Sequence, residues 1–190
     1  MGIGGRTIFV KSFVEKGVTG ALRNIFASRG KKEFEAGRLL AQAKIPTATP
    51  LGYGIGEGRS YVLQGYIDGQ HFLDALQETK SRSALLASLA HLLRTLAAHH
   101  IRHNDLHLEN ILVAGGLLHL IDLHSMTRKR SFTVGDEISN LTHALAMAYR
   151  QMSRDERLFF FHAYGKTELQ RPFETNLSGL DARWVAAKKK

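Results

Sequence analysis

The 190-residue sequence contains no cysteine. This absence excludes disulfide bonds and thiolate metal ligands, and it is compatible with a cytosolic protein. No apolar run approaches the roughly 18 residues that a membrane-spanning helix needs. The N-terminus, MGIGGRTIFVKSF, also lacks the apolar segment of a secretory signal peptide. These absences fit a cytosolic globular protein, and the lack of cysteine is also compatible with an exported one.

Acidic residues are also scarce. The chain has 17 Asp and Glu against 26 Lys and Arg, which gives a formal net charge of +9. Such an excess favours an anionic partner, for example a nucleotide, a phosphorylated sugar, an anionic lipid or a nucleic acid. Basic residues are not interleaved with aromatics along a stripe, so we expect no nucleic-acid partner. Internal repeats and long linkers are absent as well, which leaves one core or two small lobes.

Apolar periodicity predicts a small mixed β region followed by a helical region. The first region reads as a strand, a helix and a hairpin, at residues 7–13, 31–44 and 49–67. The second region reads as three amphipathic helices, at residues 81–100, 136–152 and 153–166. Ser153 with Glu156 resembles a capping box at the start of the third helix. This order predicts an α+β fold, because strands and helices do not alternate as they do in a doubly wound sheet.

The segment between the first two of these helices concentrates polar chemistry. IRHNDLHLENILVAGGLLHLIDLHS, residues 101–125, reads as two short buried strands flanked by acids and histidines. A tight AGG turn joins the strands, so we expect Asp122 to return close to Asn110. Two oxygen donors there, with the separate carboxylate of Asp105, suit a hard divalent cation and a base. A zinc site is disfavoured, because it needs three or four converging ligands and His119 should point away from its neighbours.

Parts of this segment resemble protein-kinase motifs. HNDLHLEN is similar to the catalytic loop H-R-D-x-x-x-x-N, and IDLH stands where kinases have D-F-G. With KEFEAGRLLAQAKIPTATPLGYG, the basic run after LIDLHS and DERLFFFHAYGK, the chain resembles the bacterial lipopolysaccharide-core kinases, which phosphorylate Kdo or heptose sugars. The resemblance covers roughly residues 7 to 166. It implies an α+β, protein-kinase-like fold with a small β-rich N-lobe and a helical C-lobe.

The resemblance also implies roles for individual residues. Asp105 would be the catalytic base for the attacking hydroxyl, and Asn110 and Asp122 would bind Mg²⁺. Lys11, also counted as catalytic, would pair with the α- and β-phosphates of ATP. Backbone groups at the lobe connection would contact adenine, and they belong to Gly65, Tyr66 and Ile67.

An acid on the helix at 31–44 would hold the phosphate-binding lysine, and two glutamates compete for this position. Glu33 shares a helical face with Ala36 and Leu40, so it borders the packed side. Glu35 neighbours Lys31, which is typical of a solvated pair one helical turn apart. We therefore predict that Glu33 is the partner of the lysine.

The sequence departs from the kinase pattern in places. Asn104 replaces the arginine of H-R-D, and no A-P-E segment follows Asp122. Both departures argue against a regulated protein kinase and favour a small-molecule or glycolipid acceptor. Only ten residues precede Lys11, so we expect an N-lobe without its first strands, from a fragment, a wrong start or a reduced version. The predicted division is a partial N-lobe at 1–66 and a C-lobe at 67–190.

The function that the resemblance implies is ATP-dependent phosphorylation of a sugar hydroxyl of the lipopolysaccharide inner core. The expected partners are ATP, Mg²⁺ and the lipopolysaccharide core or a lipid A precursor, with peripheral contact to the anionic inner membrane. Two alternatives stay open at this point. One is a kinase of another small molecule, such as an aminoglycoside-like compound or a free sugar. The other is a catalytically inactive kinase-like binding module.

Overall fold

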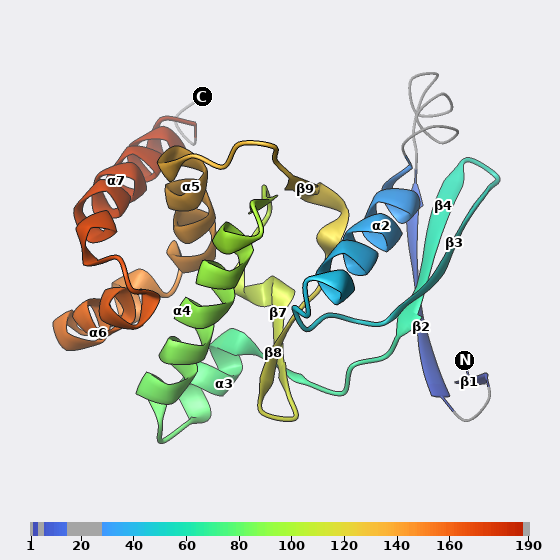
Figure 1. Cartoon of the computed structure of the whole chain (residues 1–190), viewed down its shortest axis with the longest axis horizontal. Helices are drawn as coiled ribbons and strands as arrows, with labels where there is room; N and C mark the ends of the chain where they lie inside the picture. The colour runs from blue at the N-terminus through green and yellow to red at the C-terminus, as the bar shows by residue number, and fades with distance from the viewer. Residues whose placement is uncertain (1, 4–5, 15–27, 188–190) are drawn as a thin grey trace. The chain divides into compact units, whose positions relative to one another are not determined.

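The computed structural model describes residues 2–3, 6–14 and 28–187 (Figure 1). The chain forms two compact units, each made of two stretches. Unit 1 comprises Met1–His71 and Asn110–Thr127, and unit 2 comprises Phe72–Glu109 and Arg128–Lys190. The units group the hairpin after residue 110 with the N-terminal strands, whereas the predicted division at residue 66 groups it with the helices. That lobe division stays a prediction.

Unit 1 contains a four-stranded antiparallel sheet. Its strands, in spatial order, are β1 (Gly2–Ile3), β2 (Arg6–Val14), β4 (Arg59–Gly65) and β3 (Pro50–Gly56). The β2–β4 register pairs Lys11 with Val62 and Phe13 with Ser60, so these four residues share one face. Phe13, Ser60 and Val62 are buried there. The strand and hairpin predicted from the period-2 pattern are confirmed.

Helix α2 (Arg29–Gln42) packs against this sheet and buries Glu33 and Leu40. Ser28 caps its N-terminus by accepting a hydrogen bond from the Lys31 amide at 3.2 Å. The first turn lies directly on β4, because a Cβ added to Gly30 would be 2.5 Å from the carbonyl oxygen of Tyr61. Only glycine allows this approach, which fixes where Glu33 meets the sheet.

A second sheet in unit 1 carries the acidic motif. It consists of β5 (Gln70–His71), β7 (Ile111–Ala114) and β8 (Leu117–Leu120), all antiparallel. Gly115 and Gly116 form the tight turn with φ of +56° and +76°, where a side chain would be strained. A 3₁₀ turn (η2, Leu123–Ser125) and β9 (Met126–Arg128) follow.

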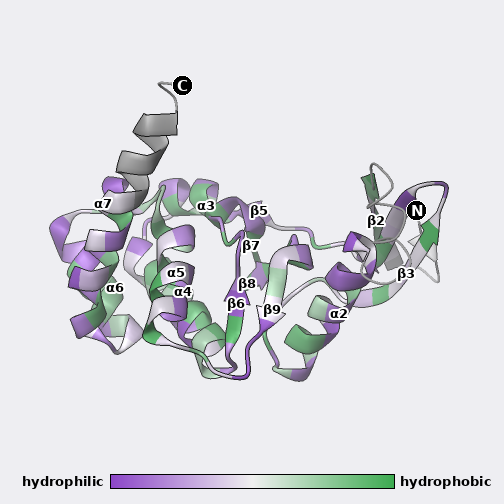
Figure 2. Ribbon diagram, turned by 90° about the horizontal axis from the view of Figure 1, so that it is seen from above, coloured by the Kyte–Doolittle hydropathy of each residue, from purple (hydrophilic) through white to green (hydrophobic). Residues whose placement is uncertain are grey.

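Unit 2 is helical apart from the short strand β6 (Ile101–His103). Its helices are α3 (Phe72–Glu78), α4 (Arg82–Ala98), α5 (Val134–Leu145), α6 (Arg154–Tyr164) and α7 (Gln170–Ala187). Helix α4 packs on α6, and α5 packs on α7. These helices carry both hydrophobic and hydrophilic residues, as Figure 2 shows for α4 and α6. Phe160, Phe161 and Phe173 are fully buried in the core of this unit.

Two sequence predictions about the helices have different outcomes. The capping box predicted from Ser153 and Glu156 is present at the start of α6. The helix predicted over 136–152 ends earlier, at Leu145, and a separate 3₁₀ turn follows at Tyr149–Gln151. The Tyr149 carbonyl accepts a hydrogen bond from the Arg157 side chain at 3.0 Å, a tertiary contact that apolar periodicity does not reveal. Within the described residues, no helix is long and apolar enough to cross a membrane.

Candidate functional site

A cavity of about 300 Å³ in unit 1 brings together most of the predicted site residues. The predicted residues that line it are Lys11, Gly65, Tyr66, Ile67, Asn110 and Asp122. Much of the remaining lining is apolar, with Phe9, Ala48 and Leu112 among it. An apolar cavity with a few converging polar groups is the usual form of a small-molecule site.

Strand register explains why these residues meet. Phe9 and Lys11 lie two residues apart on β2, so both side chains point to the same face of the sheet. On the second sheet, Ile111 pairs with Leu120, and the Ile121 amide donates to the Asn110 carbonyl at 2.9 Å. The hairpin therefore returns the segment before Asp122 to Asn110, as its length predicts.

Lys11 lies between two carboxylates. Its Nζ donates a hydrogen bond to Asp122 Oδ1 at 2.6 Å and lies 3.6 Å from Glu33 Oε1. Glu33 is buried, whereas the side chains of Lys11 and Asp122 remain 23% and 31% exposed. Of the two candidate glutamates, only Glu33 forms an ion pair with Lys11 among the described contacts. Glu35 is exposed and pairs with Lys31 at 3.8 Å, one helical turn away. Whether Glu33 supports nucleotide binding stays a prediction.

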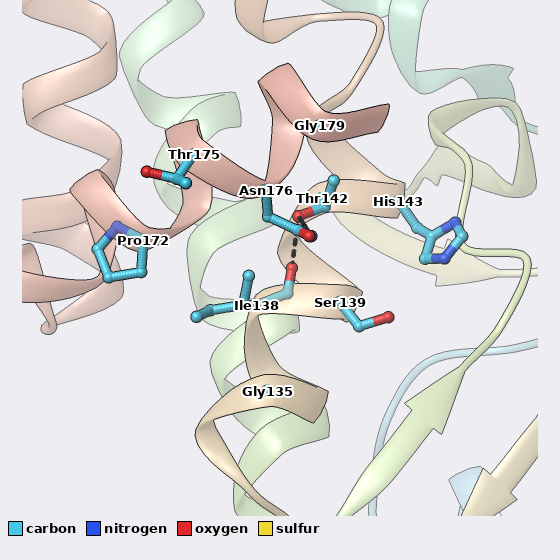
Figure 3. A pocket seen from close by; sticks show the side chains of 9 residues that line it. All are labelled: Gly135, Ile138, Ser139, Thr142, His143, Pro172, Thr175, Asn176 and Gly179. Carbon is cyan, nitrogen blue, oxygen red and sulfur yellow. Dashed lines mark hydrogen bonds between the residues drawn. The ribbon is translucent and has the colours of Figure 1, made fainter. Parts of the chain in front are cut away.

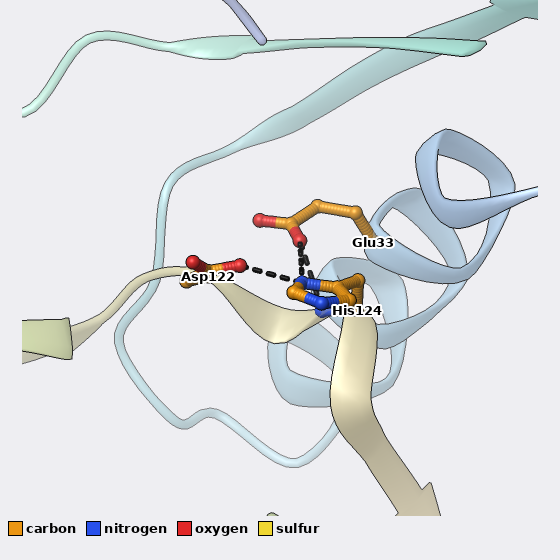
Figure 4. A group of neighbouring side chains, drawn as sticks. All are labelled: Glu33, Asp122 and His124. Carbon is orange, nitrogen blue, oxygen red and sulfur yellow. Dashed lines mark hydrogen bonds and ion pairs between the residues drawn. The ribbon is translucent and has the colours of Figure 1, made fainter. Parts of the chain in front are cut away.

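His124 joins the same cluster, and sequence reasoning did not assign it a role. Its Nδ1 lies 2.6 Å from Asp122 Oδ1, and its backbone amide donates to Glu33 Oε2 at 2.9 Å (Figure 4). The hydrogen bond to His124, followed by that to Lys11, holds the pKa of Asp122 well below its usual range. The hydrogen bonds to Asp122 and Glu33 raise the pKa of His124 to about 9. His124 is therefore an imidazolium at neutral pH, and it links α2 to the turn after β8.

Asp122 itself has an unusual backbone. Its φ and ψ are +57° and +58°, the left-handed region that costs most residues energy but that aspartate tolerates better than bulky side chains. The contacts with Lys11 and His124 stabilise this conformation. The left-handed residue ends the strand direction of β8 and begins η2.

Glu33, Asp122 and His124 form the one group of three metal-capable acids and histidines found among the described residues. Asp122 and Asn110 offer oxygen ligands to the same cavity, which is the donor type that Mg²⁺ prefers. Glu33 Oε1 is buried and lies 3.6 Å from Lys11, but it accepts no hydrogen bond from the described residues, so this oxygen can still accept a further partner. These residues fit a divalent cation.

Asp105 belongs to unit 2, and its own surroundings are well defined. His107 Nε2 lies 2.9 Å from Asp105 Oδ1. The Asp105 amide donates to His103 Nδ1 at 3.2 Å, and His103 is fully buried. Through this hydrogen bond the buried His103 braces the loop that carries Asp105. The carboxylate is about half exposed, so it is accessible to a substrate.

Helix α5 clamps the strand that leads into Asp105, a feature that sequence reasoning missed. The side chain of Asn140 accepts a hydrogen bond from the His103 amide at 3.1 Å and donates to the Ile101 carbonyl at 2.8 Å. Arg102, between them, donates to Asp136 at 3.0 Å. These partners lie more than 30 residues apart in sequence, and no local pattern marks them. The one signal in the sequence was the presence of the polar residues Asp136 and Asn140 on the buried, otherwise largely apolar face of α5.

Comparison with known proteins identifies the family. The sequence profile of the lipopolysaccharide kinase (Kdo/WaaP) family matches residues 5–164. The chain belongs to this family. It is therefore a kinase, and its family phosphorylates sugars of the lipopolysaccharide core. A kinase of this family implies ATP and a divalent cation. No curated protein sequence matches the chain.

Solved structures agree with a lipopolysaccharide-kinase fold. The structure of WaaP in complex with acyl carrier protein superposes with a TM-score of 0.70 at 19% identity, over 98% of this chain and 82% of that one. The bifunctional kinase-methyltransferase WbdD gives a TM-score of 0.55 at 20% identity, over 88% of this chain and 41% of that one. At these identities the likeness concerns the fold alone. The predicted kinase-like α+β fold is confirmed.

Proposed function

We propose that this lipopolysaccharide kinase transfers the γ-phosphate of Mg-ATP to a hydroxyl of a Kdo or heptose sugar of the inner core. The observation that carries the proposal is the cavity of unit 1, where Lys11, Asp122 and Asn110 meet the predicted adenine contacts. An apolar wall suits a purine, and a lysine beside oxygen ligands suits its phosphates. The choice of a core sugar as the acceptor rests on membership of the lipopolysaccharide kinase (Kdo/WaaP) family.

The residues of unit 1 would divide the work of holding the nucleotide. Asp122 and Asn110 would hold Mg²⁺, which when bound neutralises charge on the phosphates. Lys11 would bind the α- and β-phosphates. It has two carboxylates within reach, so Glu33 still holds it when Asp122 is engaged elsewhere. Backbone groups of Gly65, Tyr66 and Ile67 would contact adenine.

Asp105 would accept the proton of the attacking sugar hydroxyl. The hydroxyl oxygen bonds to the γ-phosphorus, the bond from that phosphorus to the β-γ bridging oxygen breaks, and ADP leaves. This role rests on the motif spacing, with Asn110 five residues after Asp105. The half-exposed carboxylate beside His107 is compatible with it. Catalysis of this kind is mainly positioning and electrostatic stabilisation.

We also propose that the protein works in the cytoplasm, at the inner face of the inner membrane, on a lipid-linked acceptor. The net charge of +9 favours contact with an anionic lipid surface. Within the basic run 128–130, the side chains of Arg128 and Arg130 are exposed, whereas Lys129 is engaged by Asp136 at 2.6 Å. The two arginines are therefore the part of this run that an anionic group can reach.

The test is thermal unfolding with and without Mg-ATP, on the unaltered protein, Asp122→Ala and Asp74→Ala. At about 100 times the dissociation constant, ligand binding adds about 2.7 kcal/mol of stability, which corresponds to a rise in Tm of roughly 5–10 °C. We expect this rise in the unaltered protein and in the control Asp74→Ala, whose side chain is exposed on α3, and its loss in Asp122→Ala. A rise that persists in Asp122→Ala would contradict the site. No rise in any folded protein would favour an inactive binding module.

A further inference from the structure

Unit 2 contains a second cavity, of about 540 Å³, between α5 and α7 (Figure 3). Ser139, Thr142 and His143 line it from α5, and Thr175 and Asn176 line it from α7. Its volume lies within the range of small-molecule sites. The nucleotide cavity belongs to unit 1 and shares none of these residues. The second cavity thus has no role in the proposed ATP site.

The lining of this cavity is hydrogen-bonding but uncharged. Among the described residues, the lining contains hydroxyls, an amide and an imidazole beside the apolar Ile138 and Pro172, and no Lys, Arg, Asp or Glu. Ser139 accepts a hydrogen bond from Arg102 at 3.4 Å, which leaves its own hydroxyl hydrogen to donate. Asn176 donates to Thr142 at 2.9 Å, so these two side chains are oriented by each other. Such a surface suits a ligand rich in hydroxyl groups. The described lining residues themselves offer no carboxylate to a polycationic aminoglycoside.

His143 connects the cavity to the predicted catalytic base. Its ring packs edge-on against the ring of His107, with centroids 6.2 Å apart, and His107 Nε2 lies 2.9 Å from Asp105 Oδ1. Burial, followed by the nearby charges of His107 and Arg102, lowers the pKa of His143. The lowered pKa favours the neutral imidazole, which can donate a hydrogen bond to a sugar hydroxyl or accept one from it.

We propose that the cavity between α5 and α7 is the acceptor site of this kinase, and that it holds the hydroxyl-bearing face of the core sugar beside Asp105. The inference rests on the proposed function, because it takes Asp105 as the base. Ser139, Asn176 and His143 would form hydrogen bonds to the sugar. Its reacting hydroxyl would extend past His143 and His107 to reach Asp105.

Two glycines allow the cavity to be filled without removing any contact. A Cβ added to Gly179 meets nothing within 4 Å, and one added to Gly135 meets only Thr133 Oγ1, at an ordinary 3.6 Å. Gly179→Met and Gly135→Met therefore project side chains into the cavity from opposite helices. Replacing a helical glycine also removes its entropic cost, so we expect both variants to fold. Ser178→Met is the matched control, because Ser178 neighbours Gly179 but is exposed outside the lining.

The first measurement is steady-state phosphorylation of a Kdo-bearing lipid A precursor. We expect the KM for this acceptor to rise at least tenfold in both glycine variants, with the KM for ATP and the Mg-ATP thermal shift within twofold of the unaltered protein. Ser178→Met should leave all three unchanged. An unaltered acceptor KM in folded glycine variants that still respond to Mg-ATP would overturn the acceptor site.

The second measurement needs no turnover. Saturation-transfer NMR with free Kdo and with a heptose, in the absence of ATP, should detect binding to the unaltered protein that both glycine variants lose. Failure of both sugars to bind the unaltered protein, or equal binding to all variants, would refute the site. Failure of the proposed function looks different, because the unaltered protein would then show neither the Mg-ATP shift nor phosphate transfer. Binding of kanamycin in place of the sugars would contradict the assigned ligand class.

Discussion

Asp122 in unit 1 and Asp136 in unit 2 are both carboxylates whose pKa is held well below the usual range, yet their surroundings differ. Asp136 is 3% exposed and accepts hydrogen bonds from Lys129, Arg102 and both the amide and hydroxyl of Thr133. Asp122 is about one-third exposed, faces a cavity and has a left-handed backbone.

The comparison shows that a strongly perturbed pKa does not by itself identify a functional residue. At Asp136, protein groups engage both carboxylate oxygens, and the carboxylate completes the capping box of α5. A ligand has no place there. At Asp122, the partners are a lysine that a second carboxylate can retain and a histidine that also contacts Glu33. Asp122 can therefore release Lys11 or His124 and bind a ligand instead, because Glu33 still holds both of these partners.

The largest effect on stability should come from Asp136→Ala. The change removes a buried carboxylate that accepts hydrogen bonds from Lys129, Arg102 and Thr133, and with it half of the capping box of α5. Because Lys129 and Arg102 are each about one-third exposed and can be hydrated, we expect a loss of about 2–3 kcal/mol. The measurement is urea unfolding at pH 7. The control is Asp155→Ala, which removes an exposed aspartate from the first turn of α6 and should change the unfolding free energy by less than about 0.5 kcal/mol.

The same variant gives a pH dependence with a defined sign. The folded-state pKa of Asp136 is below its ordinary value of 3.8, so its stabilisation is present above that pH and declines as the pH falls towards the folded pKa. The stability difference between the unaltered protein and Asp136→Ala should therefore narrow below about pH 4. A constant difference from pH 7 to pH 3 would show that packing, rather than charge, dominates.

A smaller effect, on nucleotide binding, should distinguish the two glutamates of α2. Glu33→Gln removes the buried charge that holds Lys11, and we expect the KM for ATP to rise about tenfold, equivalent to about 1.4 kcal/mol. Glu35→Gln breaks only an exposed pair with Lys31 and should stay within twofold. Equal effects of the two variants would remove Glu33 from the proposed site.

The smallest expected effect is that of Lys129→Gln. Arg102 and Thr133 still bond to Asp136 in this variant, and Lys129 itself is more than one-third exposed. We expect a loss of about 0.5–1 kcal/mol in urea unfolding and an unchanged thermal shift with Mg-ATP. Loss of the Mg-ATP thermal shift in Lys129→Gln would contradict the assignment of Asp122 to ligand binding and Asp136 to stability. It would show that the Asp136 cluster also affects nucleotide binding.

Local sequence patterns predicted much of this protein, within clear physical limits. The period-2 strands, the α4 stripe and the Ser153 capping box depend on neighbours in sequence, and they were predicted correctly. The choice of Glu33 over Glu35 followed from helical phase, and the geometry agrees.

Long-range polar contacts were not predictable in this way. The bond from His124 to Glu33 spans 91 residues, and the clamp of Asn140 on β6 spans 37. The end of α5 at Leu145 carries neither glycine nor proline, so no local signal marked it. The cavity between α5 and α7 likewise depends on how two helices pack, and no local sequence pattern indicates it.

The discontinuity of unit 1 has a consequence for how the chain folds. The pair Lys11–Asp122 closes a loop of 111 residues, and the strands β7 and β8 are synthesised only after the whole of α4. Contacts of such high sequence separation form slowly. During synthesis the ion pair between Lys11 and Asp122 therefore cannot form until residues 110–127 have been made. Pulse-labelling hydrogen exchange during refolding should show α4 protected before β2, and the reverse order would contradict this expectation. The nucleotide cavity would then be among the last features of the molecule to mature.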